Sequence, residues 1–428
     1  MTNLLPTTVL TRLTSLVSAS FFVNLSNAAI TTMIGITIAQ RGGDQSDVSL
    51  IAACYSIGYL AGCVLSPRFI SRFGYIRAFT ASAAILTISI VALDIFFAVT
   101  VWAVLRFTMG AAVAAVTAIA DAWINNRTPG DMRGRVIALY SIVLGLAAVI
   151  SQGIFVFADA GQEDLVLGFA IAMNLAVVLV ALTSATPPEI TSSSGASLFK
   201  LTSVSASANV AAFSTGFVRA SILAIVPFYL AEHDVEAGLI AANVAVFYLG
   251  RLLFQWPIGV LSDRIDRRSL IAILSVIVAA VVAIAALPGG FEGKYLVGDE
   301  GLVMQAYAFL LTLLLGGAVF PLYSVAAGLA YGRAGDEPLI EVSKTLLILN
   351  SIGAVVGPMF IVFVAPFFGD RALHLCVFAV AATTIVVALT RRGTTEPPED
   401  KITDVVAGPE TSIDMAGAAA EASVDDQR

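Results

Sequence analysis

The chain has 428 residues, of which 58% are hydrophobic and 12% are charged, and its mean hydropathy is +0.92. A soluble domain is usually about half apolar and about a quarter charged, so the composition favours a membrane protein. The formal net charge of −7, without a basic stripe in the sequence, argues against a nucleic-acid partner.

Apolar runs long enough to cross a bilayer, which takes about 20 residues, fill most of the chain. They predict an all-α membrane protein with twelve transmembrane helices in two pseudo-symmetric six-helix bundles. The first bundle, within 1–184, has helices at 13–39, 47–66, 78–97, 99–124, 135–157 and 164–184. The second, within 208–392, has helices at 208–231, 238–260, 269–287, 303–330, 341–366 and 371–390. Composition predicts a cytoplasmic linker at 185–207 and a disordered acidic cytoplasmic tail at 393–428.

The positive charges predict the orientation, because cytoplasmic loops carry an excess of Lys and Arg. With the N-terminus in the cytoplasm, external loops receive only Arg41, Lys294 and Arg371. The cytoplasmic loops receive Arg68, Arg72, Arg77, Arg127, Arg133, Arg135, Lys200, Arg264, Arg267, Arg268, Arg333, Arg391 and Arg392. We therefore expect a multi-pass protein of the cell inner membrane with both termini in the cytoplasm.

An internal repeat relates the two halves by an offset of 192 residues, the separation of Gly58 and Gly250. The same offset places Arg72 on Arg264, and Gly35 on Pro227. Parallel six-helix repeats predict two bundles with a cavity between them.

The loop after the second helix of each half carries a motif that resembles the major facilitator superfamily. The second half has Gly259, Asp263, Arg264, Arg267 and Arg268, whereas the first half keeps only Arg72, Gly74 and Arg77. The stretches FQWPIGVLSD (254–263), GAVFPLYSVA (317–326) and GAVVGP (353–358) are similar to the YcaD-like branch of bacterial carriers. The resemblance implies a secondary transporter that works by alternating access between the two bundles.

The resemblance also implies gating or coupling roles for charged residues near the helix ends. Asp121 is expected to join Arg72 in a cytoplasmic charge cluster, and Asp263 with Arg264 to form the matching cluster, although each could be an interfacial pair without a gating role. Arg106 matches an arginine that the family carries early in its fourth helix. Asp94 and Arg106 are expected to form a structural ion pair, with a protonation role for Asp94 as the alternative.

Two arginines near mid-depth, Arg219 and Arg251, are the strongest candidates for substrate binding. A charge at that depth is costly unless it lines a cavity or has a partner, and a guanidinium suits carboxylate, sulfonate or phosphate. The repeat places Asn27 and Tyr59 opposite them, and Tyr248 and Gln255 share a helix face with Arg251. Asn24, Tyr55, Tyr323 and Asn350 are further candidates for the cavity wall, with ordinary packing as the alternative.

Gly58 with Gly62, and Gly353 with Gly357, have the spacing that lets helices approach closely. The family resemblance implies that the two helices carrying these pairs meet across the halves, so we expect a moving seam there. Cys54, Cys63 and Cys376 lie in apolar runs, so we expect neither a disulfide framework nor a metal site. No cofactor is expected, and nothing in the sequence indicates an enzyme.

The sequence therefore predicts a monomeric carrier that moves a small organic anion, of the carboxylate or sulfonate type, by proton-coupled uptake. Its partners would be the anion, protons and the lipid bilayer, and the anion's charge would be held mainly by the second half. Two alternatives remain open: an efflux transporter for amphiphilic drugs or metabolites, and a transport-inactive membrane sensor.

Overall fold

The structure is a computed structural model that describes residues 7–128, 130–157, 162–182, 204–287, 302–335 and 337–390. Within these residues the regular structure is helical, with no strand. The first half contains α1 (Thr7–Gln40), α2 (Gln45–Phe73), α3 (Tyr75–Ile95), α4 (Val99–Arg127), α5 (Gly130–Phe157) and α6 (Gln162–Ala181). The second half contains α7 (Ala206–Glu232), α8 (Ala237–Ser262), α9 (Arg267–Ala285), α11 (Leu302–Tyr331), α12 (Leu339–Phe368), the short 3₁₀ helix η1 (Gly369–Arg371) and α13 (Ala372–Thr390).

Ten stretches of the described residues are long and apolar enough to cross a membrane. One of them, Glu341–Thr390, runs through both α12 and α13, and α6 adds a shorter apolar helix, Leu165–Ala181. The α-helical membrane fold that the sequence predicts is confirmed. The number of crossings, twelve, stays a prediction.

Several helices continue beyond the predicted ends, because hydropathy marks the edge of the apolar layer and not the last helical residue. The clearest case is α2, which is helical through Pro67 to Phe73, whereas the apolar run ends at residue 66. The second bundle begins slightly earlier than predicted, because the side chain of Ser205 accepts the backbone N–H of Ala208 and caps α7. Residues 183–203 of the linker region and the tail at 393–428 lie outside the described residues.

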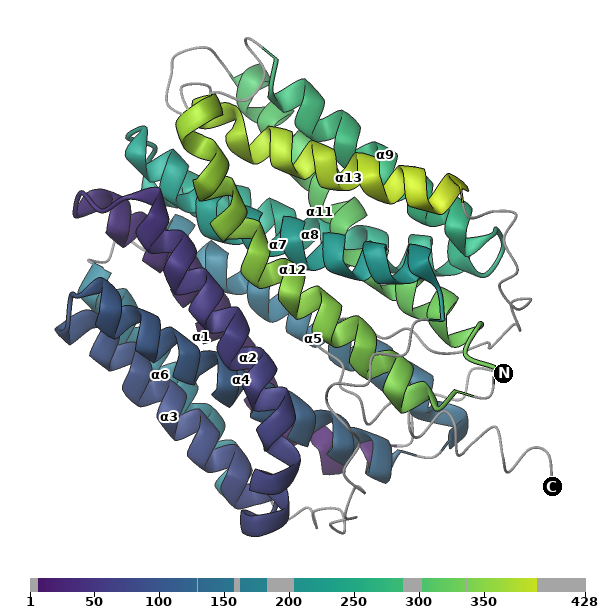
Figure 1. The fold of residues 1–428 in the computed structure, drawn as a ribbon. Helices are drawn as coiled ribbons and strands as arrows, with labels where there is room; N and C mark the ends of the chain where they lie inside the picture. Colours follow the sequence, from purple (N-terminus) through teal and green to yellow (C-terminus); the bar gives the residue numbers. More distant parts are fainter. Residues whose placement is uncertain are drawn as a thin grey trace.

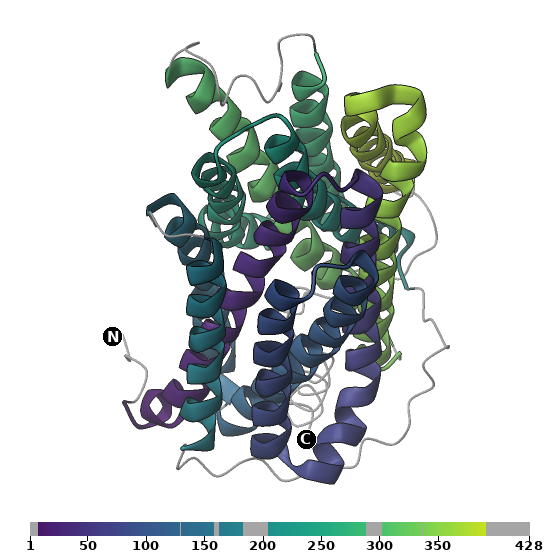
Figure 2. The same ribbon diagram turned by 90° about the vertical axis from the view of Figure 1, so that its left-hand side faces the viewer.

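The helices gather into two groups that follow the chain (Figure 1). α1 to α6 form one group, with α2 packed on α4 and α3 on α6, and α7 to α13 form the other, with α7 packed on α12 and α8 on α11. The view turned by 90° shows the purple-to-blue helices and the teal-to-yellow helices as two adjacent bundles (Figure 2).

The two bundles repeat the same close helix packing. Gly58 of α2 faces the backbone of Phe107 in α4, and Gly250 of α8 faces the backbone of Leu313 in α11. On the facing helices, Gly110 of α4 packs against the backbone of Tyr55, and Gly316 of α11 packs against the backbone of Phe247. Tyr55 and Phe247 are related by the repeat offset of 192 residues.

The glycine pairs do not form the expected seam between the halves. Gly58 and Gly62 face α4, and Gly353 and Gly357 face Phe213 and Phe217 of α7, so both pairs pack within their own bundle. α2 and α12 do contact each other across the halves, but through other residues, such as the Ser56 hydroxyl, which lies 3.5 Å from the Ala354 carbonyl. The glycine spacing correctly predicts close helix packing. The predicted packing partner is wrong, because the spacing does not indicate which helix lies opposite the glycines.

The halves also meet through α1 with α7 and through α5 with α8. A Cβ added at Gly35 of α1 would lie 3.0 Å from the Phe228 amide nitrogen and 3.1 Å from the Pro227 Cβ of α7. Gly238, in the first turn of α8, faces Val156 near the end of α5. Both contacts lie toward the end of the molecule that holds the turns 41–44 and 233–236, which we call the closed end.

Candidate functional site

A cavity of about 160 Å³ lies between the two halves. A buried water needs roughly 10–15 Å³ of such volume, so the cavity has room for about ten waters or a small organic molecule. Its wall is built from α1, α2, α4 and α5 of the first half and from α7, α8 and α12 of the second. A ligand in this cavity would therefore touch both bundles.

The charged groups in the cavity wall are all positive. Arg106, Arg219 and Arg251 line the cavity, and its described lining residues include no Asp, Glu or His. Four tyrosines, Tyr55, Tyr59, Tyr140 and Tyr248, also line the cavity, together with several Asn, Ser and Thr side chains.

Arg106 of α4 is 3% exposed, and its Nη2 donates to the Thr31 hydroxyl of α1 at 3.2 Å. Its guanidinium carbon lies 4.2 Å from the ring centroid of Tyr55, a cation–π contact. The Tyr55 hydroxyl in turn accepts the side-chain amide of Asn27 at 3.0 Å. The Nε and Nη1 atoms of Arg106 are buried and have no hydrogen-bond partner among the described residues.

Arg219 of α7 is half-buried, and its Nε is buried without a hydrogen-bond partner among the described residues. It shares the cavity wall with Ala220, Leu223 and Ala224. Residues three or four apart lie on one helix face, as Arg219 and Leu223 do. The small and apolar neighbours leave the guanidinium as the polar group of α7 in this wall.

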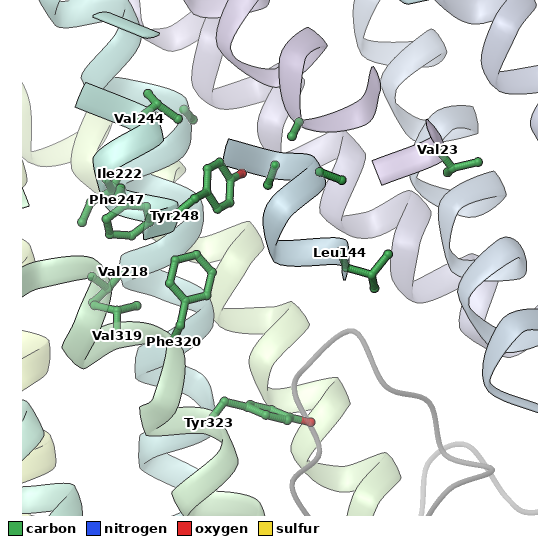
Figure 3. Close-up of a cluster of buried hydrophobic side chains, with 14 of the residues drawn as sticks. Val23, Leu144, Val218, Ile222, Val244, Phe247, Tyr248, Val319, Phe320 and Tyr323 are labelled. Carbon is green, nitrogen blue, oxygen red and sulfur yellow. The ribbon is translucent and has the colours of Figure 1, made fainter. Parts of the chain in front are cut away.

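Arg251 of α8 is 8% exposed and lies 5.4 Å from the ring centroid of Phe320 in α11. Tyr248, three residues earlier on α8, stacks on the same Phe320 ring at 5.8 Å. The close-up shows these two rings side by side, with the Tyr248 hydroxyl directed toward the first-half helices (Figure 3). The aromatic contact places Arg251 at the cavity wall of the second half.

The cavity brings together most of the residues that the sequence predicts for substrate binding. Those that line it are Asn24, Asn27, Tyr55, Tyr59, Arg219, Tyr248, Arg251 and Asn350. Two of these also join helices, since the side-chain amide of Asn24 donates to the Leu144 carbonyl and that of Asn350 to the Ala212 carbonyl. Gln255 and Tyr323 are not part of the wall; Gln255 donates to the Ser324 hydroxyl at 2.9 Å.

The predicted ion pair between Asp94 and Arg106 is absent. Asp94 is exposed near the end of α3, whereas Arg106 is buried in the cavity wall with Thr31 and Tyr55. Counting along the helices suggested similar depths for the two residues, but the two side chains face different surroundings. Arg106 is therefore a lining residue that the sequence analysis assigned to gating.

The predicted charge clusters at the helix ends also differ from expectation. Asp121 is buried, at 1% exposure, while Arg72 is exposed and stacks on Phe73 at 5.6 Å. In the second half, the carboxylate of Asp263 pairs with Arg267 at 3.8 Å, and Arg264 is exposed. Asp263 follows the last residue of α8 and Arg267 is the first residue of α9, so this ion pair spans the turn between the two helices.

A cavity with three arginines in its wall, between two bundles of membrane-length apolar helices, is typical of a multi-pass transporter. The chain belongs to the major facilitator superfamily, since a sequence model described as Major Facilitator Superfamily matches residues 16–336 and, in a second match, 208–414. It is a membrane transporter and not an enzyme. The resemblance predicted from the loop motifs is confirmed.

The relatives include the uncharacterized MFS-type transporter YcaD from Escherichia coli O6:K15:H31, strain 536. It is 25% identical over 387 residues, which cover 90% of this chain and 96% of the relative. YcaD from Escherichia coli K12, strain DH10B, is 24% identical over 388 residues, with the same shares of the two chains.

Solved structures of similar fold include the nucleoside transporter NupG, with a TM-score of 0.68 and 13% identity over 89% of this chain and 98% of that one. A D-xylose-proton symporter has a TM-score of 0.66 and 15% identity over 92% of this chain and 99% of that one. The Escherichia coli fucose:proton symporter FucP has a TM-score of 0.58 and 15% identity over 90% and 100% of the two chains. At these identities the likeness shows the fold alone.

Proposed function

We propose that the protein transports a small organic anion of the carboxylate or sulfonate type by alternating access. The observation that carries the proposal is the cavity wall, where three guanidinium groups meet and the described lining residues include no carboxylate. Arg219 and Arg251 hold the anion from the second half.

Electrostatics supports an anion over a neutral or cationic substrate. An arginine in the middle of a membrane helix costs on the order of 2.5–3.5 kcal/mol on insertion scales, and two of the three arginines in this cavity wall, Arg219 and Arg251, lie near mid-helix. A carboxylate or sulfonate offers each guanidinium a charge-assisted hydrogen bond. A cationic substrate would instead add like charge to a cavity with little water to screen it.

Uptake of an anion needs a driving force, because the inside-negative potential opposes it by about 2.3 kcal/mol per charge per 100 mV. Proton coupling supplies one, and Asp121 is our candidate for the proton-carrying group. Asp121 is buried on α4 one helical turn beyond Thr117, which lines the cavity. Asp94 is exposed and away from the wall, so it has less support in this role.

The excess of basic residues in the alternate loops supports an inner-membrane protein, here proposed as a monomer with both termini in the cytoplasm. In that orientation the closed end faces outward.

The tyrosines of the wall favour one alternative, an efflux transporter for amphiphilic drugs or metabolites. Aromatic side chains hold apolar ligands, and Tyr55, Tyr59, Tyr140 and Tyr248 all line the cavity. The third possibility, a transport-inactive sensor, depends on the tail at 393–428, which lies outside the described residues.

A thermal-shift screen of the purified protein tests the proposal, because a ligand that binds only the folded state raises the melting temperature. The screen compares carboxylates, sulfonates and phosphates with uncharged and cationic amphiphiles. We expect stabilisation by members of the anionic set. Stabilisation only by uncharged or cationic compounds would contradict the proposal and favour the efflux transporter.

A further inference from the structure

Arg106 is a cationic site in the first half that the proposed function does not use. It is 3% exposed and lines the cavity, and only its Nη2 atom has a hydrogen bond, to Thr31. Two further nitrogens, Nε and Nη1, are buried without a partner among the described residues. Buried donors are nearly always hydrogen-bonded, so these two atoms indicate a ligand that accepts from them.

Arg219 presents a second incomplete cation from the opposite bundle. Its Nε is buried without a hydrogen-bond partner among the described residues, and it lines the same cavity. α4 and α7 belong to different halves and approach the cavity from different sides. Two guanidinium groups, one from each half, therefore each have a buried nitrogen without an acceptor among the described residues.

Aromatic rings lie beside two of the three arginines in the cavity wall. Tyr55 covers one face of the Arg106 guanidinium at 4.2 Å, and Phe320 lies beside Arg251 at 5.4 Å. A ring over the face stabilises a cation but accepts no hydrogen bond in the guanidinium plane. The Nε and Nη1 atoms of Arg106 lie on different sides of the guanidinium, and each can donate a charge-assisted hydrogen bond to a carboxylate or sulfonate oxygen in that plane.

From this arrangement we infer that the substrate carries two separate anionic groups, one bound by Arg106 of the first half and the other by Arg219 of the second. This inference rests on the proposed anion transport and narrows its substrate class to dicarboxylates and their disulfonate equivalents. A monoanion carries one negative charge for these two guanidinium groups, whereas a dianion carries one for each of them.

Such a substrate also connects the two bundles. Each anionic end would be held by one half, so the dianion favours the state in which both halves close around it. A ligand can shift a conformational equilibrium only through its different affinity for the two states, and contacts to both halves supply that difference. A monoanion held by one half gains little on closure.

The test compares each diacid with its own monomethyl ester, which keeps the shape and removes one charge. The affinities of succinate, glutarate and adipate, and of their monomethyl esters, are measured by isothermal titration calorimetry on the full-length protein. Ethane-1,2-disulfonate and ethanesulfonate form the sulfonate pair. We expect at least one diacid to bind tenfold or more tightly than its ester.

Two variants and a control test whether Arg106 binds the second anionic group of the substrate. In Arg106→Gln the diacid and the ester should bind within about twofold of each other. Thr31→Val removes the hydroxyl that accepts from Arg106 and donates to the Asn27 carbonyl while it keeps the arginine; it should reduce the preference partly and serves where Arg106→Gln does not fold. The control, Arg41→Gln, removes an arginine that stacks on Phe97 outside the cavity, and it should keep the full preference.

The outcomes separate the two proposals. If a diacid and its ester bind wild-type protein equally, anion transport stands and the two-charge substrate is overturned. If the diacid preference is undiminished in Arg106→Gln, or in Thr31→Val where Arg106→Gln does not fold, the assignment to Arg106 is overturned. If no mono- or dianion binds, the proposed function itself fails.

Discussion

Gly35 offers a direct way to disturb the closed end, because it lies where α1 meets α7. A Cβ at this position would lie 3.0 Å from the Phe228 amide nitrogen, 3.1 Å from the Pro227 Cβ and 3.4 Å from the Ala224 carbonyl oxygen. These distances are already tight for a methyl group, and Gly35→Leu adds three more carbon atoms. We predict that this substitution separates the two halves at the closed end.

The size of the effect follows from the cost of overpacking, typically about 1–3 kcal/mol. Since 1.36 kcal/mol corresponds to a factor of ten, the equilibrium between closed and open should move by roughly 5- to 160-fold. The clash falls on the closed state alone, because α1 and α7 separate when this end opens. A population that is mostly closed in the parent should thus become measurably open.

Spin labels can measure the distance between the two halves at the closed end. Ser46→Cys at the start of α2 and Glu236→Cys beside α8 place labels on exposed residues of the two halves at the closed end. The background replaces Cys54, Cys63 and Cys376. Electron–electron double resonance should show a longer distance population in Gly35→Leu than in the parent.

The matched control is Gly168→Leu on α6, where nothing lies within 4 Å of an added Cβ. It should leave the distance distribution unchanged. If Gly35→Leu folds and its distribution coincides with that of the parent, the reasoning that this contact closes the protein is refuted.

Three further predictions concern stability and the corrected charge pair. Gly110→Leu should lower the melting temperature and the folded yield strongly, because a side chain there meets the backbone of Tyr55; Gly153→Leu, with open space, is its control. Asp266→Ala should cost about 1 kcal/mol by removing the cap of α9. Burial raises the pKa of Asp266, but hydrogen bonds from Ser269 outweigh it and hold the pKa below its ordinary 3.8. This stabilisation is therefore present above pH 3.8 and is lost as the pH falls through the folded-state pKa, so melting curves of wild type and variant should converge in acid. Asp94→Asn should change the free energy of unfolding by less than about 0.5 kcal/mol, since Asp94 is exposed and does not pair with Arg106. A large loss of stability would instead support the ion pair that the sequence predicts.

The architecture was predictable because the bilayer imposes a length on each apolar run and the repeat imposes an order on the runs. The helix ends were less predictable, as α2 shows by continuing through Pro67 to Phe73. Neither residue belongs to the apolar run, and what continues the helix is its backbone hydrogen bonding. The glycine spacing likewise indicated close packing but could not name α4 and α7 as the partners.

Candidate site residues can be predicted from sequence where their depth in the membrane is sufficient to identify them. Arg219 and Arg251 were found because a charge at mid-depth is costly and needs a reason. Arg106 was assigned to a pair with Asp94, because sequence gives depth along a helix but not the direction of a side chain around it. Arg106 and Asp94 do not pair because they lie on helix faces with different surroundings: Arg106 contacts Thr31 and Tyr55, whereas Asp94 is exposed. The sequence predicts that the second half holds most of the anion's charge; two of the three arginines in the cavity wall belong to that half, and Arg106 belongs to the first.

The most direct test of the account measures the affinity of the best-binding anion for wild-type protein and for Arg219→Gln and Arg251→Gln. Arg68→Gln, an exposed arginine outside the cavity wall, serves as the control. Losing a charged hydrogen-bond partner costs about 1.5–3 kcal/mol, so the account predicts a loss of about tenfold or more in each cavity variant and none in the control. Unchanged affinity in both folded cavity variants would contradict the claim that these arginines bind the substrate.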